Sequence, residues 1–273
     1  MSVKKEPSGR RSVQVEVEVP GTPEEVWRAI ATGPGITSWF VPTRFEGIDE
    51  APERLVLDFG PGMESVARIT RWNPPHGFSA ESDWAPGGPP IATEWTVEAR
   101  SGGTCVVRVV HSLFADGDDW DGQLEGTETG WPCFFRILGL YLAHFAGESC
   151  QPIQVTGFAP EPVGSAWKAL AGKLGLADAT VGEERAAPSD APPLAGTVVF
   201  AAEDEKGCEA LLRLDEPCPG AAHVFAMPMG GQVMLILRLY LYGERAREPA
   251  ARDEPRWRQW VAEKFPPPSQ DLR

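Results

Sequence analysis

The sequence predicts an α+β fold of two tandem domains, each a curved antiparallel sheet wrapped around a C-terminal helix. Elements are expected in the order strand, helices, a run of short strands and a long last helix, which differs from the βαβ alternation of parallel sheets. A weak internal repeat accompanies this order. Residues Trp27 to Ile30 match Trp167 to Leu170 at an offset of 140 residues, and Gln14-Val15 matches Gln154-Val155 at the same offset.

The length of the chain and of the repeat set the expected domain organisation. The chain has 273 residues, enough for two domains of roughly 100–200 residues each. A repeat this long indicates duplicated domains, because solenoid repeats are about 20–50 residues long. We therefore expect a polar, disordered tail over 1–11, a first domain over 12–150, and a second, more degenerate domain over 151–273.

Composition excludes several classes of protein. The formal net charge of −14 would repel a nucleic-acid backbone and an anionic membrane surface. No apolar run reaches the roughly 18 residues of a spanning helix, and the polar start shows no secretory signal, so we predict no membrane insertion. Five cysteines without a CxxC pair indicate reduced thiols, and we expect a cytoplasmic protein.

The first domain opens with a strand and a capped helix. Residues 13–19 read VQVEVEV, and such strict alternation is typical of a half-buried strand. Thr22 is the expected N-cap of the next helix, with Pro23 in its first position. The run Gly33-Pro34-Gly35 is expected to end that helix, and a second short helix should follow over Ile36 to Phe40.

Short strands and a long helix complete the first domain. Trp131, Leu138 and Phe145 belong to an apolar stripe with helical spacing, and Pro132 is expected in the first turn of that helix. The predicted strands are Arg54 to Phe59, Ser65 to Trp72, Phe78 to Asp83, Ala92 to Arg100 and Thr104 to Phe114.

The second domain repeats this plan less clearly. We expect a first helix over Pro162 to Leu174, a loop over Ala179 to Pro193, and a short closing helix over Arg252 to Phe265 with Trp257 and Trp260. The predicted strands are Gly196 to Glu203, Glu209 to Leu214, Ala222 to Met227 and Gln232 to Tyr242.

The opening of the first domain resembles a known superfamily. The run Val15 to Ile30 (VEVEVPGTPEEVWRAI), followed by Ile36 to Phe40 (ITSWF), is similar to the start of the SRPBCC (START-like) superfamily. More narrowly, it resembles homologues of the activator of the ninety-kilodalton heat-shock protein ATPase. The pieces Thr93 to Val97, Val109 to Ser112 and Gly130 to Pro132 fit the same pattern. The resemblance implies a helix-grip fold in both domains, with a cavity between the sheet and the terminal helix.

Strand parity selects the residues expected to face this cavity. Arg108 should face solvent, which turns the alternate residues of its strand inward, and Trp95 should lie on the same side. Trp39, Phe40 and Phe45 are expected at the mouth. Two arrangements are open, a ligand cavity or a core filled by the aromatic rings themselves. The candidate ligand-binding residues are Trp39, Phe40, Phe45, Trp95, Val97, Val107, Val109, His111, Leu113, Trp131, Phe135 and Leu138.

Catalytic and metal sites have little support in the sequence. His111 has two interpretations, a general acid or base that titrates near neutrality, or a hydrogen-bonded core residue. No His lies at ligand spacing to another His or Cys, so no metal site is predicted. The acidic run from Asp116 to Asp121 lacks the Gly and closing Glu of a calcium loop. Nucleophile and nucleotide motifs are absent, so we predict no cofactor and assign no catalytic residue.

Three functions fit these observations. The resemblance implies binding of lipids, hormones or polyketides, and the first interpretation is non-catalytic binding of an apolar or aromatic small molecule in the first domain. The second is a co-chaperone-like or regulatory module that binds a protein partner. The third is a cyclase or hydratase that uses His111 with Glu94 or Asp83, although parity turns Glu94 outward.

Overall fold

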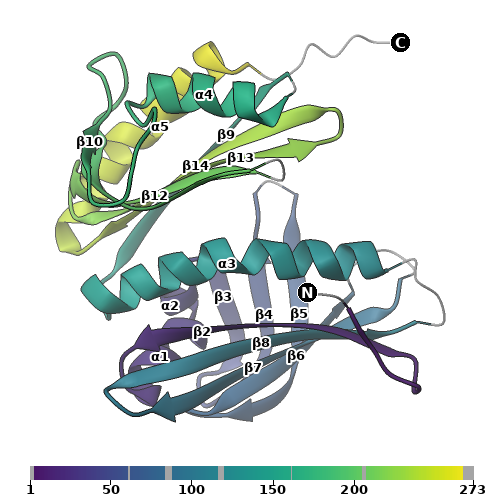
Figure 1. Cartoon of the computed structure of the whole chain (residues 1–273). Coiled ribbons are helices and arrows are strands. Elements are labelled where there is room, and N and C mark those ends of the chain that lie inside the picture. Colours follow the sequence, from purple (N-terminus) through teal and green to yellow (C-terminus); the bar gives the residue numbers. More distant parts are fainter. Residues whose placement is uncertain are drawn as a thin grey trace. The chain divides into compact units, whose positions relative to one another are not determined.

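The computed structural model describes residues 3–60, 62–83, 88–115, 120–160, 162–204 and 207–266. The chain divides into two compact units, Met1–Gly147 and Glu148–Arg273 (Figure 1). Each unit has one antiparallel sheet packed against helices and ends in a long helix. The predicted fold class, two tandem helix-grip domains, is confirmed. Among the described residues, no helix is long and apolar enough to cross a membrane.

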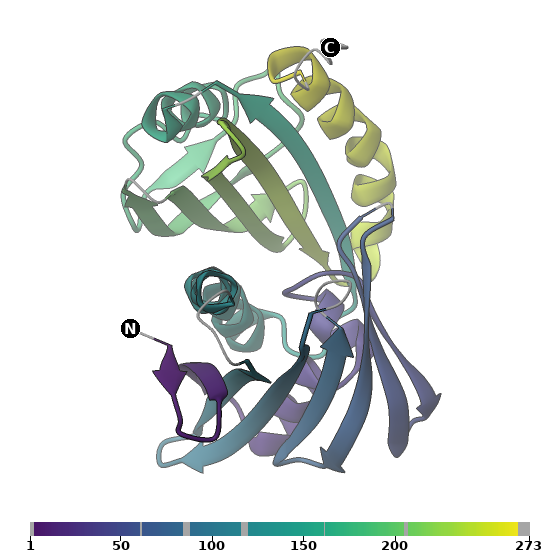
Figure 2. The same ribbon diagram turned by 90° about the vertical axis from the view of Figure 1, so that its right-hand side faces the viewer.

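The first unit contains an eight-stranded sheet with the order β1-β2-β8-β7-β6-β5-β4-β3. This sheet curves, and α3 lies along its concave face (Figure 2). The elements are β1 (Lys4–Lys5), β2 (Arg10–Pro20), α1 (Pro23–Ile30), α2 (Gly33–Thr37), β3 (Thr43–Ile48), β4 (Ala51–Asp58), β5 (Glu64–Asn73), β6 (Gly77–Asp83), β7 (Pro90–Arg100), β8 (Thr104–Phe114) and α3 (Asp121–His144).

The expected disordered tail over 1–11 is wrong for the residues from 3 onward that the structure describes. Lys4 and Lys5 form β1, which pairs with the start of β2. The basic side chains of this segment have acidic partners elsewhere in the unit. Arg11 lies 2.7 Å from Asp121, and Arg10 lies 3.3 Å from Glu94. These ion pairs hold a segment whose polar composition suggested disorder.

The first helix follows the sequence prediction and the second differs from it. Thr22 and Glu25 form a reciprocal capping box at the start of α1. The run from Gly33 was expected to end a helix, but it begins α2 instead. Thr32 caps this helix by accepting a hydrogen bond from the Gly35 amide, and Pro34 occupies its first turn, where a missing N–H costs nothing.

The terminal helix α3 is longer than predicted. It begins at Asp121, so Pro132 lies inside the helix and not in its first turn. The extra turns carry Leu124, which is fully buried against Val13 and Leu113. Leu124 lies seven residues, about two helical turns, before Trp131 and extends the apolar stripe toward the N-terminus. Its burial explains why the helix begins so early.

The second unit contains a six-stranded sheet with the order β10-β11-β12-β13-β14-β9. Two helices, α4 and α5, contribute Trp167, Leu170, Trp257 and Trp260 to one core on this sheet. The expected loop over Ala179 to Pro193 contains the short strand β10. The elements are β9 (Cys150–Ala159), α4 (Val163–Lys173), β10 (Glu184–Ala186), β11 (Ala195–Glu203), β12 (Cys208–Glu216), β13 (Gly220–Met229), β14 (Gln232–Tyr242), a short 3₁₀ turn (Glu244–Ala246) and α5 (Arg247–Lys264).

Both units share one topology. In each, a long strand (β2 or β9) leads into a helix bearing a tryptophan, and the chain returns as a meander whose last strand (β8 or β14) pairs with that long strand. Val15 of β2 pairs with Val109 of β8, and Val155 of β9 pairs with Leu237 of β14. Because Val15 and Val155 are also the repeat positions of the sequence, these strands can be compared residue by residue.

Gly157 allows α5 to pack closely on β9. A Cβ atom at this position would lie 2.8 Å from the Phe265 Cβ and 2.9 Å from the Val261 Cγ1. We expect Gly157→Ala to lower the free energy of unfolding by about 1–3 kcal/mol, because the helix must shift to relieve this overpacking. Urea denaturation measures the change. Gly164→Ala is the matched control, since its Cβ would meet no atom within 4 Å. Equal destabilisation by both substitutions would contradict the prediction.

Candidate binding pocket

The first unit has a pocket of about 500 Å³ between its sheet and α3. Strands β4 to β8 form one wall, and α3 together with α2 and the residues after it forms the other. Most of the lining is apolar. The aromatic lining residues are Trp39, Phe40, Phe59, Phe78, Trp95, Trp131 and Phe134, and the aliphatic ones are Ile36, Leu55, Leu57, Val66, Ala67, Ala80 and Ile91.

Trp131 of α3 lies at the centre of the aromatic lining. Its ring is stacked on Phe40 at 5.4 Å between ring centroids, and it meets the edge of Trp95 at 5.2 Å. Trp39 lies 6.4 Å away, and its indole N–H donates to the Ala29 carbonyl oxygen. Rings held in these edge-to-face and offset contacts form a rigid apolar surface, suited to a flat aromatic ligand.

A polar chain of three side chains crosses the apolar wall. The Trp131 Nε1–H donates to Nε2 of His111 at 2.7 Å, and the other ring nitrogen of His111, Nδ1, lies 2.9 Å from Oγ1 of Thr93. Because an indole nitrogen only donates, Nε2 must accept, and the proton of the neutral imidazole is on Nδ1. His111 therefore donates to Thr93.

Burial determines the charge of His111. Only 7% of the residue is exposed, and desolvation lowers the pKa of His111 from its ordinary value of 6.5 to about 4. The imidazole is neutral at pH 7. Of the two interpretations of His111 from the sequence, this favours the hydrogen-bonded core residue over a group that titrates near neutrality.

The structure brings five of the candidate residues into the pocket wall: Trp39, Phe40, Trp95, His111 and Trp131. Trp39 was expected at the mouth, but only 1% of it is exposed, so it forms an inner wall. Phe45 lies outside the lining and packs against Trp72 and Phe78. The remaining candidates are buried in the core beyond the pocket: Val97, Val107, Val109, Leu113, Phe135 and Leu138.

Several lining residues were missed from the sequence. Phe134 lies one position before the predicted Phe135 on α3, and it is Phe134 that lines the pocket. Thr93 lies two residues before Trp95, so the same strand parity pointed to it. Leu55 and Leu57 lie at alternate positions of β4, and Phe59 follows that strand. Leu55, Leu57 and Phe59 are spaced two residues apart, and all three line the same wall of the pocket.

The rim of the pocket is more polar and more exposed than its interior. Phe59 is 39% exposed and Val66 is 50% exposed, which places them at the entrance. Glu64 and Asp83 add two carboxylates to the lining, at the start of β5 and the end of β6. The mouth is therefore apolar and acidic together.

Neither Glu94 nor any acidic residue of the run from Asp116 to Asp121 is among the described residues that line the pocket. Asp116, Asp118 and Asp119 fall outside the described residues. Asp121 lies 2.7 Å from both Lys5 and Arg11, and hydrogen bonding by Lys5 and then Arg11 lowers the pKa of Asp121. Glu94 pairs with Arg10 on the face of β7 opposite Trp95, as parity predicted.

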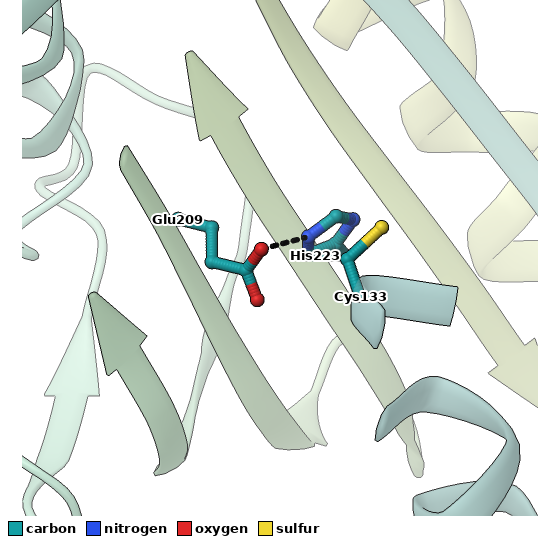
Figure 3. Close-up of side chains that lie close together, drawn as sticks. All are labelled: Cys133, Glu209 and His223. Carbon is teal, nitrogen blue, oxygen red and sulfur yellow. Dashed lines mark ion pairs between the residues drawn. The ribbon is translucent and has the colours of Figure 1, made fainter. Parts of the chain in front are cut away.

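The second unit has a buried histidine of its own. His223 of β13 is 1% exposed, and its Nε2 lies 3.9 Å from a carboxylate oxygen of Glu209 on β12 (Figure 3). This distance is too long for a hydrogen bond. The His223 ring stacks on Phe225, with 4.9 Å between the centroids. This pair leaves no signal in the sequence, because the two residues are 14 positions apart and share no motif.

Residues 10–133, which contain most of the pocket wall, match the family model described as polyketide cyclase / dehydrase and lipid transport. The first unit is thus similar to this family over most of its length. No curated protein matches the chain.

The chain is also similar to solved structures. DynU16, a putative protein in the dynemicin biosynthetic locus, is 19% identical with a TM-score of 0.40, over 92% of this chain and 95% of that one. The di-domain ARO/CYC BexL is 13% identical with a TM-score of 0.44, over 93% and 99%. Aha1 from Colwellia psychrerythraea is 18% identical with a TM-score of 0.40, over 48% and 95%.

The polar pair in the pocket wall of the first unit has an apolar counterpart in the second unit. His111 pairs with Val13 and Thr93 in the first sheet, whereas the residue at the equivalent register position of the second sheet, Leu239, pairs with Ile153 and Ala222. Aliphatic residues thus replace the polar pair. Between the second sheet and its helices, a space of about 10 Å³ lies beside Leu170 and Trp260, which is at most room for one water molecule. A larger groove of about 490 Å³ is lined by α4 and by Phe158 and Phe265, and of the aromatic residues only these two phenylalanines are among its described lining residues.

Proposed function

We propose that the first unit binds a neutral apolar or aromatic small molecule in the pocket between its sheet and α3, without covalent chemistry. The observation that carries this proposal is a pocket of about 500 Å³ lined by seven aromatic rings. This volume lies within the usual range of roughly 300–1,000 Å³ for small-molecule sites. The family model that residues 10–133 match, described as polyketide cyclase / dehydrase and lipid transport, supports the same class of ligand.

The state of His111 supports binding over catalysis. A general acid or base works best with a pKa near the working pH, and burial lowers the pKa of His111 to about 4. Both ring nitrogens are engaged, one by Trp131 and one by Thr93. Glu94, one of the two carboxylates considered as its partner, lies on the opposite face of β7. His111 therefore orients the pocket wall in this proposal and transfers no proton.

We propose a structural role for the second unit. Its core is filled, and Leu239 and Ala222 stand at the register positions of His111 and Thr93. Trp260 and Phe265 lie in contact, with 6.2 Å between their ring centroids, in the region between the sheet and α5. A unit packed in this way contributes stability and shape, and the ligand site belongs to the first unit alone.

A second candidate function is the binding of a protein partner. Met63 is 59% exposed and lies between Phe59 and Val66, the two exposed residues at the pocket entrance. Exposed apolar groups around a cavity serve ligand entry and also attract partners. Filling the pocket distinguishes the two functions, because it blocks the ligand and leaves this outer surface unchanged.

Filling the pocket is expected to remove ligand binding. Ala67 lines the pocket from β5 and is half-buried. We expect Ala67→Leu to weaken binding of the neutral probe N-phenyl-naphthylamine about tenfold or more, because the added methyl and methylene groups occupy ligand space. Fluorescence titration measures the affinity. Ala92→Leu, on β7 and also half-buried, is the matched control, since Ala92 does not line the pocket. Unchanged affinity in Ala67→Leu would place the site elsewhere.

A further inference from the structure

The polar chain in the pocket wall has a fixed direction. The Trp131 indole can only donate, so His111 accepts at Nε2 and carries its proton at Nδ1. The contact between Nδ1 and Thr93 Oγ1 is then a hydrogen bond donated by the imidazole. The last acceptor in this chain of hydrogen bonds is the Thr93 hydroxyl oxygen.

The Thr93 hydroxyl therefore keeps its own hydrogen for another acceptor. Thr93 lines the pocket and is half-buried, so its side chain borders the pocket space. Among the residues that the structure describes, the imidazole is the single hydrogen-bond partner of this hydroxyl. A hydroxyl that accepts from His111 and borders an apolar space can still donate its own hydrogen to an acceptor in that space.

The other charges at the pocket select against an anionic ligand. Glu64 and Asp83 line it, and none of the described lining residues is Lys or Arg. Arg44 lies near this rim, but its guanidinium pairs with Glu64 at 2.9 Å. A carboxylate on the ligand would meet two like charges and gain no cation in the wall.

We infer that Thr93 donates a hydrogen bond into the pocket and that the ligand is a neutral aromatic molecule with a carbonyl oxygen as its acceptor. Trp131 and Trp95 hold the rings of such a ligand, while Thr93 fixes its orientation through the one polar atom. This inference rests on the proposed function and adds the chemical class of the ligand. The carbonyl acceptor separates this class from plain hydrocarbons, and its lack of charge separates it from fatty-acid carboxylates.

Three fluorescent probes of one ring system test this inference on the full chain. The first is propionyl-dimethylaminonaphthalene, a neutral ketone. The second has propyl in place of propionyl, and the third has a carboxylate there. We expect wild type to bind the ketone roughly 3- to 10-fold more tightly than the propyl probe, the range expected for one neutral hydrogen bond. The carboxylate probe should bind more weakly than either.

Two variants locate the hydrogen bond. Thr93→Val should remove the preference for the ketone, and Thr93→Ser, which keeps the hydroxyl, should restore it. Thr96→Val is the matched control, because Thr96 lies on the opposite face of the same strand and its buried hydroxyl has no hydrogen-bond partner among the described residues. The infrared carbonyl band of the ketone bound to wild type should lie at lower frequency than in hexane. This last measurement needs no variant to fold.

The outcomes separate the inference from the proposed function. If the ketone and propyl probes bind wild type equally, and the carbonyl band is unshifted, Thr93 donates nothing and the inference is overturned while the pocket stands. A preference that survives in Thr93→Val would also overturn it. If none of the three probes binds wild type, the proposed function itself fails, and the inference fails with it.

Discussion

Replacing Trp95 by alanine is expected to lower the free energy of unfolding by about 3–5 kcal/mol and to abolish binding of an apolar probe. Trp95 is 6% exposed and lies between the sheet and α3. Its ring stacks on Phe78 with 6.0 Å between centroids and meets the edge of Trp131 at 5.2 Å. Removing it leaves a cavity in the core and takes away the wall against which a flat ligand lies. Trp131→Ala is expected to act in the same way.

Destabilisation alone would also weaken binding, so the experiment needs a control of equal severity. Trp260 in the second unit is 5% exposed and contacts Trp257 and Phe265. Trp260→Ala should destabilise the protein by a similar amount and leave the affinity for N-phenyl-naphthylamine unchanged at temperatures where the protein is folded. Chemical denaturation and fluorescence titration give the two quantities separately. Wild-type affinity in both Trp95→Ala and Trp131→Ala would rule out this pocket as the ligand site.

The sequence predicted the fold well where its patterns were local. Alternation in residues 13–19 identified β2, and Thr22 with Pro23 identified the start of α1. Parity on β8 turned His111 inward and Arg108 outward, where Arg108 pairs with Glu16. These predictions were correct because one face of each element is buried, and burial leaves a periodic trace in the sequence.

The sequence predicted less where distant segments meet. The ion pairs that order Arg10 and Arg11 come from β7 and α3, so composition alone indicated disorder. Thr93 resembles any polar strand residue until its register opposite His111 is known. The difference between lining and core also has no periodic signal. Trp95 and Val97 face the same side of β7, yet only Trp95 reaches the pocket.

The two units share one topology, but only the first has the polar pair His111 and Thr93 at this register position. Val15 and Val155 occupy the same place in their sheets, and from these positions the strand pairings lead to His111 with Thr93 in one unit and Leu239 with Ala222 in the other. Two sheets of one topology thus differ at the position where the first has its buried hydrogen bonds. Burying a polar pair costs free energy unless its hydrogen bonds are made. Its presence in the unit that has the aromatic pocket is therefore consistent with a role of this pair in the proposed ligand binding.

Acid is expected to destabilise the protein through His111. Its pKa in the folded state is about 4, below the ordinary value of 6.5 that it regains on unfolding. Between these values the unfolded state binds more protons than the folded state, so stability falls as the pH is lowered through this window. His111 contributes its full stabilising effect above about pH 6.5 and loses it by about pH 4. The difference amounts to about 3 kcal/mol.

His111→Gln isolates this effect from the other titrating groups. Glutamine still accepts from the Trp131 indole and donates to Thr93, but it does not titrate in this range. At pH 7 the substitution should change the unfolding free energy by about 1–3 kcal/mol, the cost of a disturbed buried hydrogen bond. On going from pH 7 to pH 4, wild type should lose about 3 kcal/mol more than the variant. Urea denaturation at a series of pH values measures both curves. Parallel curves would mean that His111 binds a proton in the folded state near neutrality, and the hydrogen-bond direction from Trp131 through His111 to Thr93 would then be wrong.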